Sequence, residues 1–284
     1  MTISIGLLYD QLRPEERMII EVAKKNSVEL NLYNAEELTV ELTTNNGYNF
    51  DSVILQRSIS YFRGLHLAAA LESSGIHMIN SFQAAYTCGN KLFGTLALQK
   101  AKIPTPRAVV AFTPDSAIEA LKKLKCPAVL KPVVGSWGRL VAPLLDEDSA
   151  RAIFEDREVM FPLYQVYYIQ EMINKPHRDI RCFVIGEKAV AAMYRYPPVG
   201  DWRTNASREG TVEACPLTGE LKEISESAAR AMGDGIFGVD LMEGPDGLLV
   251  HEVNSTPEFK SLVNVTNVDI ASLTLDYAMG LAKK

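Results

Sequence analysis

Several signatures of common protein classes are missing from this chain of 284 residues. No apolar run approaches the ~18–20 residues that a membrane-spanning helix needs. The first residues, "MTISIGLLYDQLRPEER", lack the basic region and the small-residue cleavage site of a signal peptide. The net charge of −6 gives no overall excess of cations for binding nucleic acid through its phosphates. These absences predict a cytoplasmic protein that binds neither membrane nor nucleic acid.

Cysteine and histidine are scarce and scattered. The four cysteines form no C-x-x-C pair, and the four histidines include no H-x-x-x-H spacing. Zinc sites and disulfide frameworks usually show such spacings, so we interpret the cysteines as small core residues, with a disulfide or a zinc site as the alternative. Two nucleotide-binding motifs are also missing. No G-K-[ST] follows the glycines near residue 135, and no G-x-G-x-x-G follows the first predicted strand, which excludes a P-loop and a dinucleotide-binding domain.

The length and composition, with 47% hydrophobic and 23% charged residues, are typical of a soluble globular protein of about two domains. Strand and helix patterns alternate over residues 1–88, which predicts a small parallel sheet with helices on both faces. Residues 89–165 form a small α+β unit, and hairpin patterns beyond Asp179 predict antiparallel sheet in residues 166–284. The expected fold class is therefore α/β and α+β, with an open α/β N-terminal domain, a small α+β lid and an antiparallel α+β C-terminal domain.

The stretch "VLKPVVGSWGRLV", residues 129–141, places a lysine and several small residues at the end of an apolar strand. Gly135 and Gly138 allow backbone N–H groups to approach an anion closely, and Lys131 adds a point charge beside them. The loop is therefore a candidate for covering phosphates. The alternative is a tight turn between two strands whose lysine reaches water.

Asp240, Glu252 and Asn254 are candidate metal ligands in "VDLME" and "HEVNS". Glu252 and Asn254 point to the same face because strand side chains alternate with a period of two. If Asp240 pairs opposite Glu252, the three oxygen ligands converge, and this register requires an odd-length loop around Gly244–Gly247. Two carboxylates and an amide oxygen suit a hard cation such as Mg²⁺ that bridges phosphates. The alternative is that both carboxylates are charges on an exposed face.

A third set of candidate residues is cationic. Several arginines and an asparagine lie in or after a sheet that should face those carboxylates, and guanidinium groups bind phosphates and carboxylates bidentately. A solvated, salt-bridged surface is the alternative for each of them. The set consists of Arg178, Arg181, Arg195, Arg203 and Asn205.

Taken in chain order, these three sets resemble the ATP-grasp fold of carboxylate–amine ligases. The motifs "DIR" and "E-V-N" are shared with the RimK-like amino-acid ligases. The chain is most similar to their LysX and ArgX branch, through "CGNK", "KPHRDIRCFVIGE", "CPLT" and "EVNSTPEFK", which together with the loop motif cover nearly the whole chain. The resemblance implies an N-terminal pre-ATP-grasp domain (1–88), a central ATP-grasp lid (89–165) and a C-terminal ATP-grasp domain (166–284).

The resemblance also implies roles for individual residues. Mg²⁺ would be held by Asp240, Glu252 and Asn254, and the choice of amino acid would depend on Ser261 and Leu262. The charged reactants would be held by Arg181, Arg195, Arg203 and Asn205. ATP would be bound by Lys91, Lys131, Gly135, Ser136, Trp137, Gly138, Arg139, Asp179 and Asn205, with its adenine along Gln170, Glu171, Met172 and Ile173.

The function implied by the resemblance is that of a ligase that uses ATP and Mg²⁺. The γ-phosphoryl group of ATP would pass to the C-terminal glutamate carboxylate of a small acidic carrier protein of the LysW type. The amino group of 2-aminoadipate or glutamate would then attack the acylphosphate, in lysine or arginine biosynthesis. An acidic carrier requires a basic landing patch, for which the candidates are Arg63, Lys175, His177 and Arg178.

Two other functions remain open at this stage. Another RimK-like ligase, adding glutamate to a cofactor or to a protein tail, would share the catalytic residues and differ in its acceptor. A catalytically silent ATP-binding module has no need for a complete set of metal ligands, so the intact set argues against it. The oligomeric state is also open: related folds often form symmetric homo-oligomers, but no interface is evident in the chain.

Overall fold

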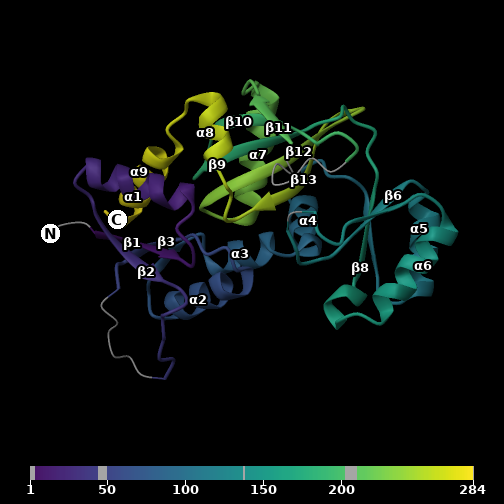
Figure 1. Ribbon diagram of the computed structural model, residues 1–284, viewed down its shortest axis with the longest axis horizontal. Helices are drawn as coiled ribbons and strands as arrows, with labels where there is room; N and C mark the ends of the chain where they lie inside the picture. Colours follow the sequence, from purple (N-terminus) through teal and green to yellow (C-terminus); the bar gives the residue numbers. More distant parts are fainter. Residues whose placement is uncertain (1–3, 44–49, 137, 202–209, 284) are drawn as a thin grey trace.

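The computed structural model of the chain describes residues 4–43, 50–136, 138–201 and 210–283 (Figure 1). Within these ranges three β-sheets form the framework, two with four strands and one with five. In Figure 1 the N-terminal sheet lies to the left, the five-stranded sheet above the centre, and the other four-stranded sheet to the right.

The N-terminal unit alternates strands and helices: β1 (Ser4–Tyr9), α1 (Pro14–Lys25), β2 (Glu29–Asn34), β3 (Val53–Gln56), α2 (Tyr61–Ser73), β4 (His77–Ile79) and α3 (Phe82–Cys88). The sheet order is β2-β1-β3-β4, and all of its pairs are parallel. The inner strands are apolar and buried, so they need cover on both faces. α1 packs on one face and α2 on the other, which confirms the expected parallel sheet between helices.

The helix α9 (Ile270–Ala282) lies beside α1 and completes the cover of this first sheet. Ile5 of β1, Ile19 of α1 and Leu275 of α9 belong to one buried cluster. The same cluster continues into the five-stranded sheet through Ile185, so the N-terminal sheet and the C-terminal part of the chain share a core. None of the described helices is both long and apolar enough to cross a membrane.

The central unit consists of β5 (Ala108–Ala111), α5 (Pro114–Leu124), β6 (Ala128–Lys131), β7 (Ala142–Leu144), α6 (Glu147–Glu158), a 3₁₀ turn (Pro162–Gln165) and β8 (Tyr167–Glu171). Its sheet has the order β5-β8-β6-β7, and β8 is antiparallel to both of its neighbours. The sequence assigned β8 to the C-terminal domain, because a boundary was expected after residue 165. Since β8 is hydrogen-bonded on both edges inside this sheet, we propose that the central unit ends after Glu171.

The C-terminal unit contains β9 (Asp179–Ile185), β10 (Lys188–Tyr196), β11 (Thr211–Ala214), α7 (Gly219–Met232), β12 (Ile236–Gly244), β13 (Gly247–Asn254) and α8 (Lys260–Thr266). The strand order is β11-β10-β9-β12-β13 with antiparallel pairs throughout, as the sequence predicted. α7 packs on one face of this sheet and α8 on the other. The helix α4 (Lys91–Lys100) packs against α7 and β13, which places its first residue beside the β12–β13 hairpin.

Candidate active site

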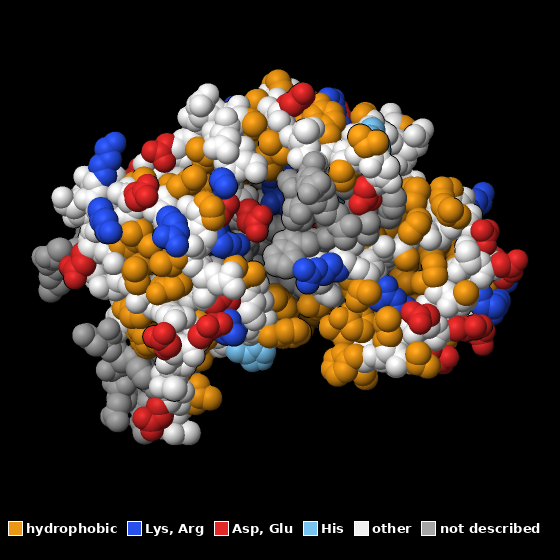
Figure 2. All heavy atoms as spheres, viewed as in Figure 1, with side chains coloured by type: hydrophobic (Ala, Val, Ile, Leu, Met, Phe, Trp, Pro, Cys, Tyr) orange, Lys and Arg blue, Asp and Glu red, His pale blue; other side chains and the backbone are white. Residues whose placement is uncertain are grey.

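A cavity of about 560 Å³ is lined by residues of the N-terminal, central and C-terminal units. Figure 2 shows the surface hollowed near the middle of the molecule, with basic and acidic side chains at the edge of the hollow. Among the described residues, eight lysines and arginines line the cavity, against five carboxylates. This surplus of positive charge suits a polyanionic ligand better than a bare cation.

Asp240 of β12 lies opposite Glu252 of β13, so the register expected from the sequence is confirmed. The predicted odd-length loop, however, is wrong. Gly244 pairs with Gly247, which leaves a turn of two residues, and the odd residue is a β-bulge at His251. Two-residue turns are the commonest hairpin connections, and a bulge re-aims the side chains that follow it. As a result His251 and Glu252 both line the cavity.

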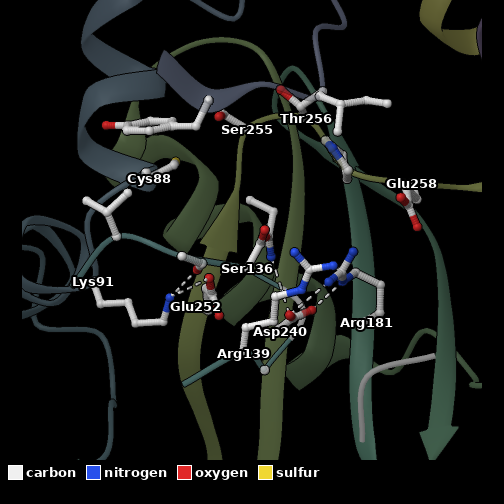
Figure 3. A pocket seen from close by; sticks show the side chains of 18 of the residues that line it. Cys88, Lys91, Ser136, Arg139, Arg181, Asp240, Glu252, Ser255, Thr256 and Glu258 are labelled. Carbon is white, nitrogen blue, oxygen red and sulfur yellow. Dashed lines mark hydrogen bonds and ion pairs between the residues drawn. The ribbon is translucent and has the colours of Figure 1, made fainter. Parts of the chain in front are cut away.

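Asp240 is held by two arginines and an asparagine, and Figure 3 shows its contact with Arg181. Arg181 binds both carboxylate oxygens, and Nη2 of Arg195 lies 3.2 Å from Oδ2. Asn254 donates from Nδ2 to the same oxygen at 3.3 Å. Burial alone would raise the pKa of this carboxyl, but Arg181 and Arg195 outweigh burial and hold the pKa well below its usual range. Asp240 is therefore a carboxylate at neutral pH.

Arg195 has a second carboxylate partner. Its Nε and Nη2 atoms donate to the two oxygens of Asp179 at 2.7 and 2.8 Å, and both side chains are almost fully buried. The register of β9 with β10 places Arg195 directly opposite Asp179. The two predicted arginines, Arg181 and Arg195, thus converge on Asp240, while Asp179 fixes the orientation of Arg195.

Two lysines, Lys91 of α4 and Lys131 of β6, lie near Glu252. Nζ of Lys91 donates to the carbonyl of Gly135 at 2.8 Å and lies 3.4 Å from Oε1 of Glu252. Nζ of Lys131 donates to Oε1 of Gln170 at 2.6 Å. Lys131 is buried, and desolvation lowers the pKa of its ammonium group to about 8. An anion bound beside Lys131 would favour its charged form.

The glycine-rich loop joins β6 to β7 and lines the cavity with Gly135, Ser136, Gly138 and Arg139. Gly135 (φ +152°) and Gly138 (φ +62°) adopt backbone conformations that residues with a side chain rarely take. Glycine is therefore required for the path of this loop along the cavity. Three residues expected at the site, Trp137, Arg203 and Asn205, lie outside the described residues.

The expected adenine segment, residues 170–173, does not line the cavity. β8 is an inner strand, so the backbone of Gln170 is paired with strands on both sides. The N–H groups of Glu171 and Met172 donate to carbonyl groups of neighbouring segments. The side chain of Gln170 accepts the hydrogen bond from Lys131. Recognition of adenine by the backbone of residues 170–173 stays a prediction without support from the cavity lining.

The two residues expected to select the amino acid lie in different surroundings. Ser261 lines the cavity, whereas the side chain of Leu262 is fully buried in the core that α8 shares with the sheets. Successive residues of a helix point ~100° apart, so one can face a ligand while the next faces the core. Leu262 does not line the cavity, so its part in the choice of amino acid stays a prediction.

The basic residues expected to receive an acidic carrier are largely engaged within the chain. Arg178 binds both oxygens of Glu243, at 2.7 and 2.8 Å. Lys175 donates to the carbonyl of Arg178, and Arg63 forms ion pairs with two acidic residues of the N-terminal unit. His177 is exposed. A landing patch at these residues therefore stays a prediction.

A set of charged residues that the sequence had not indicated lies at the end of the cavity that the N-terminal unit forms. Arg13, Glu15, Glu258 and Lys260 line this end. Glu15 and Glu16 suit the first turn of a helix because of the helix dipole, but both are buried, at 4% and 0% exposure. Buried carboxylates need partners. Arg13, three residues before Glu16, was therefore the signal in the sequence that could have indicated this set.

Two family descriptions together match most of the chain. Residues 88–278 match the RimK-like ATP-grasp domain, and residues 5–87 match the LysX preATP-grasp domain. The chain belongs to the RimK-like ATP-grasp family. The expected family, the ATP-grasp fold and the class of ATP-dependent ligase are thereby confirmed.

The similarity of this ATP-grasp chain to individual relatives extends over nearly its whole length. It is 34% identical over 277 residues to the alpha-aminoadipate–LysW ligase LysX of Sulfolobus acidocaldarius, covering 96% of this chain and 100% of the relative. It is 32% identical over 275 residues to the glutamate–LysW ligase ArgX of Sulfurisphaera tokodaii, covering 96% and 97%. The crystal structure of a RimK domain ATP-grasp protein from Sphaerobacter thermophilus matches with a TM-score of 0.79 at 25% identity, covering 98% of this chain and 100% of that chain.

Proposed function

We propose that this ATP-grasp ligase joins the amino group of 2-aminoadipate or glutamate to the C-terminal glutamate carboxylate of a small acidic carrier protein of the LysW type. Similarity over nearly the full length to ligases named for both amino acids supports this reaction. The observation that carries the proposal is the convergence of Asp240, Glu252 and Asn254 in a cavity with surplus cations. Such a cavity suits ATP, an acidic carrier tail and an acidic amino acid, all of which are anions.

Asp240, Glu252 and Asn254 fit a Mg²⁺ ion that arrives together with the nucleotide. Their oxygens are the ligands that a hard cation prefers, and the three side chains lie on facing strands. Each carboxylate already contacts a cationic side chain, Arg181 or Lys91, which a bare metal ion would have to displace. Phosphate oxygens offer those cations alternative partners, so metal and nucleotide should bind together. When bound, Mg²⁺ neutralises charge on the β- and γ-phosphates.

The first step transfers the γ-phosphoryl group of ATP to the carboxylate of the carrier. A carboxylate oxygen attacks the γ-phosphorus, the bond from phosphorus to the bridging oxygen breaks, and ADP leaves. Positioning and charge neutralisation are the main contributions of a protein to such a transfer. Lys91, Lys131 and the loop residues Gly135, Ser136 and Gly138 line the cavity. Their ammonium and backbone N–H groups would bind phosphate oxygens there.

The second step forms the amide bond. The unprotonated amino group of the amino acid attacks the carbonyl carbon of the acylphosphate, and the tetrahedral intermediate expels inorganic phosphate. The new amide nitrogen loses a proton to complete the reaction. Asp179 holds the guanidinium of Arg195 in position, and Arg181 lines the same cavity, so both can stabilise the negative charge of the intermediate. Closure of the 135–139 loop would exclude water, which hydrolyses acylphosphates.

The two candidate amino acids differ by one methylene group, a difference that enzyme pockets discriminate by ~10–200-fold. Ser261 is the member of the expected selecting pair that lines the cavity. Selection between 2-aminoadipate and glutamate is therefore assigned to Ser261 and its surroundings. A free amino acid and a carrier protein are substrates of a biosynthetic enzyme, for which we propose a cytoplasmic location.

The release of ADP from Mg-ATP tests the proposal. We expect release to require both a purified LysW-type carrier and either 2-aminoadipate or glutamate. Turnover with 2-aminoadipate alone would assign the enzyme to lysine biosynthesis, and turnover with glutamate alone to arginine biosynthesis. A carrier that lacks its C-terminal glutamate is the matched control and should give only background release. An enzyme that shows no carrier-dependent release with either amino acid would refute the proposal.

A further inference from the structure

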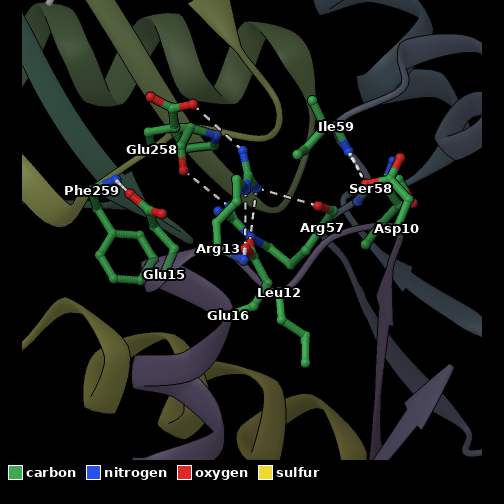
Figure 4. Close-up of polar contacts among 12 residues, drawn as sticks. Asp10, Leu12, Arg13, Glu15, Glu16, Arg57, Ser58, Ile59, Glu258 and Phe259 are labelled. Atoms are coloured by element: carbon green, nitrogen blue, oxygen red, sulfur yellow. Dashed lines mark hydrogen bonds and ion pairs between the residues drawn. The ribbon is translucent and has the colours of Figure 1, made fainter. Parts of the chain in front are cut away.

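A cluster of charged side chains lies at the end of the cavity formed by the N-terminal unit. We call Arg13, Glu15, Glu16 and Arg57 the Glu16 cluster (Figure 4). Glu16 is fully buried, and its carboxylate accepts hydrogen bonds from the backbone and guanidinium of Arg13 and from Nε of Arg57, at distances between 2.9 and 3.0 Å. Nη1 of Arg57 donates to the carbonyl of Pro257 at 3.0 Å. The cluster therefore joins the N-terminal unit to the loop that follows the metal-ligand strand β13.

Glu15 fixes this loop at a second point. Its Oε1 atom accepts hydrogen bonds from the backbone N–H groups of Phe259 and Lys260, at 3.2 and 3.0 Å. Figure 4 shows Glu15 beside Phe259 and Arg13 beside Glu258. The N-terminal unit therefore binds the loop on both sides of Glu258, through Arg57 before it and Glu15 after it, so Arg13 has a defined position relative to that residue.

One edge of the Arg13 guanidinium is bound to Glu16, and its remaining nitrogen, Nη1, faces Glu258 in the loop after β13. Nε and Nη2 donate to Glu16 at 3.0 and 2.9 Å, whereas Nη1 lies 3.6 Å from Oε1 of Glu258, beyond hydrogen-bond distance. The Arg13 side chain is 15% exposed and that of Glu258 is 54% exposed. Ion pairs with an exposed partner contribute little stability, so another carboxylate can replace Glu258 at little cost.

The charges of the cluster balance without Glu258. Arg13 and Arg57 carry two positive charges, and the buried carboxylates of Glu15 and Glu16 carry two negative charges. Arg13 therefore has no need of a further carboxylate for burial. A guanidinium held rigidly by a buried partner is pre-organised to bind a second acid, because little side-chain entropy is lost on binding.

We propose that Arg13 binds the side-chain carboxylate of the incoming acidic amino acid, in the place that Glu258 takes in this structure. The inference rests on the proposed function, because it takes 2-aminoadipate or glutamate as the substrate. A free amino acid fits this end of the cavity better than the tail of a carrier protein, because Arg13 is largely enclosed. The apolar side chains of Leu65 and Ala85 also line the cavity and are available to the methylene groups of the substrate.

Arg13 is then a residue that determines specificity. It favours a carboxylate over an amide at the end of the substrate side chain. Loss of a hydrogen bond to a charged group weakens binding by ~10–100-fold. Since Arg13 belongs to the N-terminal unit and the phosphate-binding lysines belong to α4 and β6, its loss should raise the KM for the amino acid and not the KM for ATP.

Steady-state kinetics of full-length variants test this inference, with glutamate, 2-aminoadipate and glutamine as the amino acids. In Arg13→Met we expect the KM for the acidic amino acids to rise ~10–100-fold and the preference for glutamate over glutamine to fall by a similar factor. The KM values for ATP and for the carrier should stay within ~2-fold of wild type, and Arg13→Lys should be intermediate. Arg17→Met is the matched control, because Arg17 is an exposed arginine one turn further along α1 and should behave as wild type.

Glu258→Gln tests whether the substrate carboxylate displaces Glu258 from Arg13. Without the competing carboxylate, the KM for the acidic amino acids should fall by ~2–5-fold. Unchanged selectivity in an active Arg13→Met variant would overturn the inference alone, and so would a rise in KM confined to the carrier. If Arg13→Met does not fold, unchanged KM values in both Arg13→Lys and Glu258→Gln would overturn it. Failure of the wild-type enzyme to use either acidic amino acid would instead overturn the proposed function and this inference with it.

Discussion

Asp240 lies opposite Glu252 across a hairpin whose turn has only two residues. The bulge at His251 reconciles this register with the short turn and brings His251 and Glu252 to the same cavity. The two carboxylates thereby lie between Lys91 on one side and Arg181 on the other. We propose that both share a metal ion when phosphates engage those cations.

Glu252→Gln should abolish carrier-dependent ADP release without unfolding the protein. The amide keeps the shape of the side chain and removes the negative charge that the metal–nucleotide complex requires. Glu252 is partly exposed and lies 3.4 Å from Lys91, so the loss of stability should be only ~0–1 kcal/mol. Asp246→Asn, in the exposed turn of the same hairpin, is the control and should keep full activity. Unchanged carrier-dependent ADP release in Glu252→Gln would contradict the proposed role of Glu252 as a metal ligand.

The buried ammonium group of Lys131 should make ATP binding depend on pH. Desolvation lowers its pKa to about 8, so in the nucleotide-free protein the group loses its charge as the pH rises through that value. Bound phosphate favours the charged form, so the KM for ATP should rise by up to ~10-fold for each pH unit above 8. Lys131→Arg stays charged and should flatten this dependence. A wild-type KM that is constant from pH ~7 to ~9.5 would contradict the expectation.

Gln170 should affect ATP binding through Lys131. Besides accepting from Lys131, its side chain donates to the hydroxyl of Tyr168 at 3.3 Å, and that hydroxyl lies 2.8 Å from Oγ1 of Thr95 on α4. Gln170→Leu leaves the buried ammonium without this acceptor and should raise the KM for ATP by ~10–100-fold. Tyr168→Phe removes a more distant hydroxyl and should have a smaller effect. Equal effects of the two substitutions would mean that this series of hydrogen bonds matters for packing and not for the position of Lys131.

We expect Ser261 to affect the choice of amino acid and Leu262 to affect the stability of the fold. Leu262→Ala removes a fully buried side chain and should lower the free energy of unfolding by ~2–5 kcal/mol, measured by urea denaturation, without changing the preference between the two amino acids. Ser261→Val adds bulk at the cavity wall and should change that preference while altering stability by less than ~1 kcal/mol. A changed preference in Leu262→Ala would show that Leu262 also affects specificity.

The hairpin that carries Asp240 shows how far local patterns lead. The alternation of side chains along a strand is a local property, and from it the sequence predicted that the proposed oxygen ligands share one face. The bulge at His251 could not be predicted from such a local pattern. It depends on the two-residue turn and on the burial of Val250 and Val253 in a core that α7 completes. The sequence therefore predicted correctly that Asp240 lies opposite Glu252, but it wrongly attributed this register to an odd-length loop.

Long-range packing limited the other predictions. The apolar sequence of β8 suits any buried strand, and only its pairing with β5 and β6 assigns it to the central sheet. Glu15 resembled an ordinary residue of a first helical turn, but its partner Phe259 lies 244 residues away. Leu262 is buried by contacts of the same long-range kind. Motifs spread along the chain, by contrast, identified the family before any contact was known.

The intact mass of the carrier protein tests the central claim most directly. Incubation of the enzyme with Mg-ATP, a LysW-type carrier and 2-aminoadipate or glutamate should increase the mass of the carrier by one amino-acid residue. Fragmentation should locate the addition at the C-terminal glutamate. A carrier that stays unmodified with both amino acids, in the presence of folded enzyme that binds ATP, would contradict the assignment.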